Sequence, residues 1–299
     1  MDESFNPTAV RTGGRDVLEE ATLIGPAARR MFTVLHLPAS RLIGGVVICS
    51  PLHAEFAHNY RREVLIARDL AMHGVAVQRF HYVGTGNSDG DSDALTWESM
   101  QRDAHVASDL LRDRTSVEML SFLGTRMGAF AAVGAAARFP GSPLALWEPC
   151  LDAAGYFRDI VRHAVIRDVA QSASSAGTSR PSFDDIEQGS ADILGYSVGA
   201  PLYASFAGRH LRDELATDPR ELLLIQLDRN DRMRAGFADL IHDRIANRHP
   251  TEARAVRTNE SWWFLGDPAD SRRPTKAVVD ATSRWLLGVL GSRSPTTTR

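Results

Sequence analysis

Cysteine is scarce in this sequence of 299 residues, which contains only Cys49 and Cys150. Two cysteines cannot build the disulfide framework of a small secreted domain, so this count favours a reducing compartment. The sequence also lacks an apolar run of about twenty residues, the length that crosses a bilayer. Residues 1–16 lack the apolar centre of a signal peptide. We therefore expect a soluble, cytoplasmic protein without a membrane role.

Charge of one sign is not concentrated anywhere in the sequence. The 34 basic residues are scattered among 37 acidic ones, and the formal net charge is −3. No basic block is long enough to hold a phosphate backbone, so a nucleic-acid partner is not expected. No His, Cys and Asp residues have metal-ligand spacing, and the glycines of 84–90 (GTGNSDG) do not open a helix as a dinucleotide-binding motif does. We expect no metal, no cofactor and a small-molecule substrate as partner, and a homo-oligomer is compatible with the sequence.

The sequence does contain a regular alternation of strand-like and helix-like segments. Its hydrophobic content of 43% is enough to bury one large core, or one core and a modest lid. Residues 44–51 (GGVVICSP) have the apolar character of a buried parallel strand, and residues 59–74 have apolar positions at helical spacing. The other predicted strands are 21–25, 29–37, 75–84, 117–124, 143–149, 221–228 and 253–258, and the other predicted helices are 96–113, 129–139, 237–248 and 275–290. This alternation is typical of an α/β protein with a mainly parallel sheet covered on both faces.

One segment interrupts the alternation between the strand at 143–149 and the strand at 221–228. Within it, residues 171–185 (QSASSAGTSRPSFDD) are poor in apolar residues and rich in serine, which is typical of a surface loop. We therefore divide the chain into a first core part (1–151), an inserted lid (152–219), a second core part (220–291) and a disordered tail (292–299).

The motif at residues 123–129 (LGTRMGA) follows an apolar strand and leads into a helix of small residues. Strand, tight glycine turn and helix form the arrangement in which hydrolases of this topology present a nucleophilic serine, but Arg126 stands at its centre. Together with residues 80–91 (FHYVGTGNSDGD) and 146–159 (LWEPCLDAAGYFRD), the motif makes the sequence resemble the α/β-hydrolase superfamily over nearly its whole length. The resemblance implies an α/β-hydrolase fold, with a mostly parallel central sheet of about eight strands flanked by helices and an inserted lid.

Shorter matches resemble a narrower group, the exosortase-A-system-associated hydrolases and related serine-aminopeptidase-like proteins. They are the Leu-Trp-acid-Pro stretch at 146–149, the lid motif at 192–203 (DILGYSVGAPLY), and Pro51 followed by Glu55 and Arg61. In that group an arginine at the elbow is usual, so Arg126 fits the group while it departs from the wider superfamily.

A serine hydrolase needs a serine, a histidine that takes its proton and an acid that orients the histidine. Asp228 or Asp231 can supply the acid, since both follow the strand at 221–228. The histidine is expected between the last strand and the last helix, but residues 259–274 contain none. Two of the three members are therefore absent from their expected positions.

A second serine motif lies inside the predicted lid. Residues 195–199 (GYSVG) match Gly-x-Ser-x-Gly, which makes Ser197 an alternative nucleophile with Asp228 or Asp231 as its acid. Three features argue against it. The preceding run 191–194 is short, Pro201 begins a helix without a small-residue face, and only two further strands follow. We rank Ser197 below Arg126 and interpret it as part of a lid turn.

Arg126 requires carboxylate partners, because an elbow already has the positive end of a helix and an unpaired buried guanidinium is costly. In the implied sheet order, the loops after the two neighbouring strands supply Glu55 and Glu148. Either these carboxylates hold Arg126 and it fills an inactive site, or Arg126 binds a substrate carboxylate or polarises a carbonyl while Glu55 or His53 moves protons.

The expected substrate pocket surrounds this arginine. Its predicted lining is Leu52, Met127, Cys150, Trp262, Trp263 and Phe264. The three aromatic residues can line an apolar pocket or simply fill volume over the sheet.

Two functions remain open at this point. One, which the resemblance implies, is an atypical enzyme that lacks a Ser-His-Asp triad and acts on a small acyl or carboxylate-bearing molecule in a biosynthetic pathway, by ester or thioester hydrolysis or by a lyase or cyclase step. The other is an inactive binding or scaffold protein with the same fold.

Overall fold

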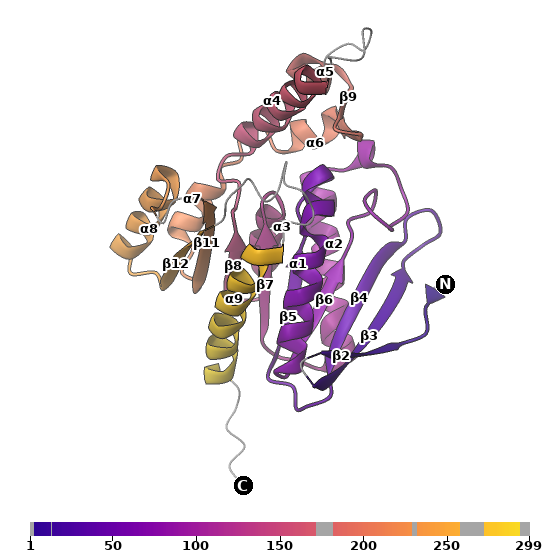
Figure 1. Ribbon diagram of the computed structural model, residues 1–299, viewed down its shortest axis with the longest axis vertical. Helices are drawn as coiled ribbons and strands as arrows, with labels where there is room; N and C mark the ends of the chain where they lie inside the picture. The colour runs from indigo at the N-terminus through magenta and orange to yellow at the C-terminus, as the bar shows by residue number, and fades with distance from the viewer. Residues whose placement is uncertain (1–2, 13, 172–181, 229–231, 258–271, 294–299) are drawn as a thin grey trace.

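A central sheet of ten strands organises the protein in our computed structural model, which describes residues 3–12, 14–171, 182–228, 232–257 and 272–293. Figure 1 shows this sheet with helices packed on its two faces. In spatial order the strands are β1 (Glu3–Ser4), β3 (Arg15–Ile24), β4 (Met31–Pro38), β6 (Val75–Phe80), β5 (Gly44–Cys49), β7 (Leu120–Thr125), β8 (Leu144–Trp147), β11 (Leu222–Asp228) and β12 (Thr251–Arg257), and β2 (Thr8–Thr12) pairs with β3. In this spatial order, β6, β5, β7, β8, β11 and β12 run parallel to one another. The pairings of β1 with β3, β2 with β3, β3 with β4 and β4 with β6 are antiparallel.

The inner parallel strands β5, β6, β7 and β8 are buried on both faces, as the apolar run of β5 predicts, whereas the edge strand β12 is only partly buried. In β5, Val46 and Ile48 belong to one hydrophobic cluster, while Val47 and Cys49 belong to the other. This alternation follows from the two-residue period of a strand. The first cluster packs under α1 (His53–Met72) and α9 (Arg272–Arg293), and the second packs under α2 (Trp97–Thr115) and α3 (Gly128–Ala136).

The start of α2 shows how local sequence sets an element boundary. The Thr96 side chain accepts a hydrogen bond from the Ser99 amide, and the Ser99 hydroxyl accepts one from the Thr96 amide. This reciprocal capping box satisfies two donors that a helix start leaves without an internal partner. The sequence predicts this helix start correctly.

The sheet has more strands than the predicted eight because the chain before residue 21 also forms strands. Strand β3 begins at Arg15, and β2 pairs with it through a register that ends at Thr12 and Arg15. Gly14 in the connection has φ +79°, a left-handed conformation that glycine adopts without a steric cost. Alternating polar residues along 15–20 hide the hairpin from a search for apolar runs.

Between β8 and β11 the chain forms a group of short elements, whose described members are α4 (Ala153–Gln171), α5 (Phe183–Gln188), β9 (Ser190–Ile193), β10 (Tyr196–Gly199), α6 (Ala200–Ser205) and α7 (Leu211–Thr217). Of these, α4, α5, α6 and β9 lie above the carboxyl ends of the parallel strands (Figure 1). Strands β9 and β10 form their own antiparallel pair, and α7 packs beside α8 (Ala235–Ala246). A short 3₁₀ helix, η1 (Ser92–Ala94), contacts β10 from the core. Within the described ranges, no helix combines the length and apolarity needed to cross a membrane.

Candidate functional site

The turn between β7 and α3 places Arg126 at the carboxyl edge of the sheet. Arg126 has φ +53°, and the glycines on either side make this sharp turn possible. A Cβ on Gly124 would lie 2.6 Å from the Ala129 Cα, and one on Gly128 would lie 2.2 Å from the Cys49 carbonyl oxygen. The Gly-x-Arg-x-Gly spacing is therefore a steric requirement for bringing α3 this close to the sheet.

Three residues with left-handed backbone conformations gather at this edge. His53, Arg126 and Glu148 have φ values of +54°, +53° and +47°. They follow β5, β7 and β8, which are adjacent strands in the sheet. Such a conformation costs a non-glycine residue about 1–3 kcal/mol, and such residues cluster where a site needs side chains aimed in a particular direction. The carboxyl edge of a parallel sheet is also where ligands of α/β proteins bind.

Arg126 is held by Glu55, which lies in the first turn of α1. The Arg126 Nε donates to the Glu55 Oε1 at 3.1 Å, and the two side chains are 11% and 2% exposed. Arg126 Nη1 also donates to the backbone carbonyl of Glu148 at 3.4 Å. Burial disfavours the charged guanidinium, yet neighbouring Cys150, Glu55 and Glu148 raise the pKa of Arg126 above its ordinary value. Arg126 is therefore a fixed cation.

Glu148 differs from its predicted role as a carboxylate partner of Arg126. Its carboxylate instead accepts hydrogen bonds from the Leu227 amide on β11 and from the Arg234 guanidinium. The left-handed backbone of Glu148 turns its carbonyl toward Arg126 and its side chain toward β11. Burial raises the pKa of Glu148, and Arg234 opposes that effect. Among the described residues, the site thus contains the ion pair of Arg126 with Glu55 and that of Arg234 with Glu148.

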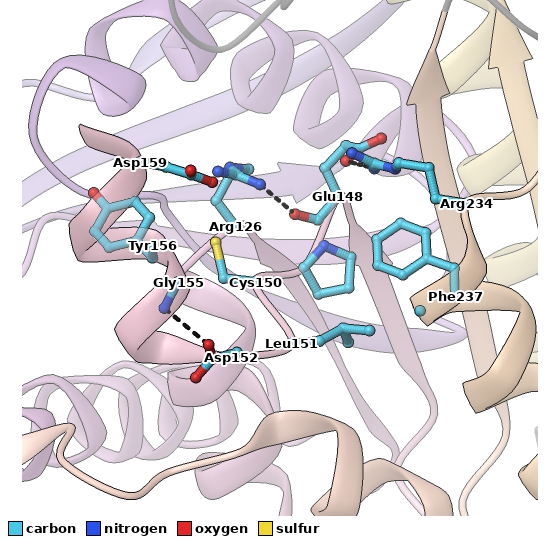
Figure 2. Close-up of a pocket in the computed structure, with 12 residues that line it drawn as sticks. Arg126, Glu148, Cys150, Leu151, Asp152, Gly155, Tyr156, Asp159, Arg234 and Phe237 are labelled. Carbon is cyan, nitrogen blue, oxygen red and sulfur yellow. Dashed lines mark hydrogen bonds and ion pairs between the residues drawn. The ribbon is translucent and has the colours of Figure 1, made fainter. Parts of the chain in front are cut away.

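A pocket of about 280 Å³ opens beside Arg126. Figure 2 shows Tyr156 and Asp159 of α4 at one end of the pocket and Arg234 with Phe237, at the start of α8, at the other. Cys150 lies between the two ends. The lining consists of Arg126, Glu148, Pro149, Cys150, Leu151, Asp152, Gly155, Tyr156, Asp159, Arg234, Gly236 and Phe237.

His53 is the first residue of α1 and contacts Tyr156. Its Nδ1 is 3.2 Å from the Tyr156 hydroxyl, and its ring meets the Tyr196 ring edge-on at a centroid distance of 6.4 Å. Burial lowers the pKa of His53 to about 4, so the imidazole is neutral at pH 7. His53 is not among the residues that line the described pocket.

The described structure brings together only part of the predicted pocket lining. Cys150 lines the pocket, and burial raises the pKa of its thiol to about 12, with Arg126 opposing. Leu52 and Met127 do not line it. Their side chains are buried in a hydrophobic cluster, because each residue is the N-cap of a helix that packs on the sheet. Trp262, Trp263 and Phe264 lie outside the described residues.

The alternative nucleophile lies in a different setting. Ser197 is in β10, where it pairs with Asp192 across a regular antiparallel register. Its hydroxyl donates to the Asp93 carboxylate of η1. A regular strand does not present a side chain as a sharp strand-to-helix turn does. Asp228 is the last residue of β11, and Asp231 lies outside the described residues.

Of the pocket residues, the sequence predicted only Arg126, Glu148 and Cys150; those that it missed include Tyr156, Asp159, Arg234 and Phe237. One available signal was the spacing of Tyr156 and Asp159, three residues apart just after a strand end, because such residues share a helix face. For Arg234 and Phe237 the sequence offered no comparable signal, since their position depends on how α8 packs beside β11.

No protein-family model and no curated protein sequence matches the chain. Solved structures do match it. Est1E from Butyrivibrio proteoclasticus with bound ferulic acid is 14% identical with a TM-score of 0.65, over 90% of this chain and 99% of that chain. A thermostable carboxyl esterase from Bacillus coagulans is 12% identical with a TM-score of 0.60, over 91% and 99%. XC6422 from Xanthomonas campestris, an α/β serine hydrolase without a lid, is 15% identical with a TM-score of 0.52, over 94% and 97%. These likenesses show that the chain has the α/β-hydrolase fold.

Proposed function

We propose that this protein is an enzyme that acts on a small acyl compound by acid/base chemistry, without a serine acyl-enzyme. The observation that carries the proposal is the placement of Arg126. A buried, fixed guanidinium stands at the turn where serine hydrolases hold their nucleophile, and it lines a pocket of about 280 Å³. The resemblance of the motif around Arg126 to the exosortase-associated group supports the same reading, including a role in biosynthesis.

The charges around the pocket favour a neutral carbonyl over a carboxylate as the group that meets Arg126. The lining contains two arginines, Arg126 and Arg234, and three acidic residues, Glu148, Asp152 and Asp159. Glu55 adds a further carboxylate directly beside Arg126. A ligand carboxylate would therefore enter a region that already has more negative than positive side chains. An ester or thioester carbonyl accepts the same hydrogen bond without adding charge.

In this proposal Arg126 supplies the electrophilic part of the chemistry. Its guanidinium donates to the carbonyl oxygen of the acyl group and stabilises the negative charge that develops there in the transition state. Since Glu55 holds the guanidinium in place, little reorganisation is needed at the moment of reaction. The proposal extends to ester or thioester hydrolysis and to lyase or cyclase steps, because each places negative charge on a carbonyl oxygen.

Glu55 supplies the base. Its Oε1 accepts from Arg126, while its Oε2 is buried and has no hydrogen-bond partner among the described residues. Burial raises the pKa of Glu55, with Arg126 opposing, which moves this carboxylate toward the basicity that proton abstraction requires. Glu55 is not among the residues that line the described pocket, so the proposal requires that a water molecule or an acidic C–H group reaches Oε2 past the Arg126 guanidinium.

A second candidate function, an inactive binding or scaffold protein, is favoured by one specific observation. Both pocket arginines already have carboxylate partners, Glu55 for Arg126 and Glu148 for Arg234. A pocket whose charges are paired internally can be a stable remnant that binds a ligand without transforming it.

Turnover of a panel of short-chain esters and thioesters separates these possibilities. Arg126→Met is expected to lower kcat/KM about 10²–10³-fold, the loss typical of removing an oxyanion donor. Ser197→Ala is the matched control and is expected to leave kcat/KM within about twofold of the wild type. If Ser197→Ala abolishes both turnover and labelling by a fluorophosphonate probe, the proposal is wrong. If no acyl compound is turned over while one raises the wild-type Tm, the binding function replaces it.

A further inference from the structure

We propose that the edge strand β12 pairs antiparallel with β12 of a second copy of this chain, so that the two central sheets join across a two-fold axis at Ala253. The proposal does not depend on the proposed function, since none of the residues that line the described pocket belongs to β12. It rests on the unpaired side of β12, on the direction of its backbone groups and on its charges.

The first observation is the edge itself. Strand β12 is seven residues long and pairs with β11 along its whole length, without a bulge or a proline. Among the described residues, no strand pairs with its other side, whereas the opposite end of the sheet is the two-residue strand β1. Figure 1 shows β12 at its end of the sheet, with α8 beside it. An unpaired edge of this length is a template for another strand.

The second observation is the direction of the backbone groups. The Pro250 carbonyl accepts a hydrogen bond from the Leu222 amide at 3.0 Å, so it faces β11. Backbone groups of successive residues in a strand face opposite sides. The even-numbered residues of β12 therefore face β11, and the odd-numbered residues direct their N–H and C=O groups away from the sheet. Two copies related by a two-fold axis at Ala253 can exchange both hydrogen bonds of a hydrogen-bonded antiparallel pair there.

The third observation is that the charges of β12 select this register. Glu252 and Arg254 are two residues apart on one face of the strand, and their side chains are 40% and 39% exposed. An axis at Ala253 places each Glu252 opposite Arg254 of the second copy, twice over. An axis at Glu252 or Arg254 places like charges opposite each other, which is destabilising. A strand protected against pairing has charges of one sign on its edge, whereas these charges complement themselves.

Helix α8 adds apolar surface beside this edge. Arg244 of α8 donates to the Thr251 hydroxyl at 2.8 Å and to the Pro250 carbonyl at 3.2 Å, which fixes the helix to the start of β12. The next residue, Ile245, is 64% exposed, more than any other large hydrophobic residue of the described chain. The two-fold axis is perpendicular to the sheet, so α8 of both copies lies on the same face. Apolar side chains near such an axis are typical of homodimer interfaces.

Charge reversal tests the register by sedimentation velocity. The wild type is expected to sediment as a dimer at about 100 μM and to dissociate on dilution. Glu252→Arg and Arg254→Glu each place like charges opposite each other in a homodimer, so each variant alone is expected to be a monomer. An equimolar mixture of the two restores every opposite-charge pair and is expected to form a heterodimer. The double variant Glu252→Arg/Arg254→Glu is expected to dimerise by itself.

A backbone variant tests strand pairing separately from the charges. Ala253→Pro removes the outward N–H group at the axis, and an edge strand tolerates proline where the N–H faces solvent. This variant is expected to unfold cooperatively and to sediment as a monomer. The matched control is Arg138→Glu, which reverses one charge of the exposed pair with Asp109 on other elements. The control is expected to remain a dimer.

Three results would overturn the proposal. The first is a wild type that stays monomeric at about 100 μM. The second is a dimer that persists in either single charge variant or in Ala253→Pro, because it would place the interface elsewhere on the surface. The third is an equimolar mixture of the two charge variants that stays monomeric, because the selected register requires the heterodimer.

Discussion

The pairing of Arg126 with Glu55 gives the most direct prediction about stability. Their side chains are 11% and 2% exposed, so the pair is largely removed from solvent. Replacing Arg126 with methionine leaves the Glu55 carboxylate buried without its guanidinium. Removing one partner of a buried ion pair costs about 3–5 kcal/mol, because an uncompensated charge stays behind. We therefore expect Arg126→Met to lower the free energy of unfolding by about that amount.

The backbone at Arg126 refines this expectation. Any residue with a Cβ bears a steric cost at φ +53°, which glycine avoids. Arg126→Gly loses the same ion pair as Arg126→Ala, but it releases this strain. We expect the glycine variant to be more stable than the alanine variant by about 1 kcal/mol, after the larger entropy of glycine in the unfolded chain is included.

A double-mutant cycle measured by urea denaturation tests the pair. Replacing both partners, in Arg126→Met/Glu55→Leu, leaves no buried charge, so the double variant is expected to be more stable than Arg126→Met alone. The matched control is Arg138→Met, which removes an ion pair with Asp109 whose side chains are 50% and 46% exposed. Such a surface pair is expected to contribute less than about 1 kcal/mol. If the changes in the free energy of unfolding of Arg126→Met and Glu55→Leu add up to that of the double variant within about 0.5 kcal/mol, the two residues are not coupled and the reasoning is refuted.

Three further predictions concern residues around the site. Burial raises the pKa of Glu63 to about 7 from its ordinary 4.5, so the wild type should lose stability as the pH rises through about 7. Glu63→Gln, which keeps an acceptor for the Ser50 hydroxyl, should be more stable than the wild type at about pH 8 by about 3 kcal/mol and no more stable at about pH 4, as urea denaturation can show. Gly128→Ala should not give a stable protein, because the new Cβ would lie 2.2 Å from the Cys49 carbonyl oxygen; a cooperative melting transition at the wild-type Tm would contradict this. The Cys150 thiol, buried and with its pKa raised to about 12, should react with iodoacetamide at neutral pH only after unfolding, which mass spectrometry of native and unfolded samples can check.

The fold was predictable from the sequence because its signals are local or periodic. The apolar run at 44–51 and the alternation of strands and helices depend on spacing along the chain, and they become β5 and the parallel half of the sheet. The glycines at 124 and 128 likewise predict a tight turn, because only a residue without a Cβ fits there. The hairpin of β2 and β3 was not predicted, since its polar alternation lacks a strong apolar signal.

The site was only partly predictable, because a long charged side chain can reach several partners and the sequence does not show which of them it contacts. Glu148 occupies the expected strand end, but its carboxylate meets Leu227 and Arg234 while its carbonyl meets Arg126. The contact between His53 and Tyr156 joins residues that are 103 positions apart in sequence, on two different helices. It depends on how the insertion packs over the sheet edge, and single-sequence patterns do not describe that packing.

The account depends most on Arg126 meeting a carbonyl group, and a crystal structure with a small ligand tests this directly. Crystals are soaked in parallel with an unreactive amide, N-methylacetamide, and with acetate at the same concentration. We predict amide density in the pocket with its carbonyl oxygen within hydrogen-bond distance of the Arg126 guanidinium, and weaker or absent acetate density there. Amide density only elsewhere, or a pocket that stays closed to both compounds at saturating concentration, would contradict the account.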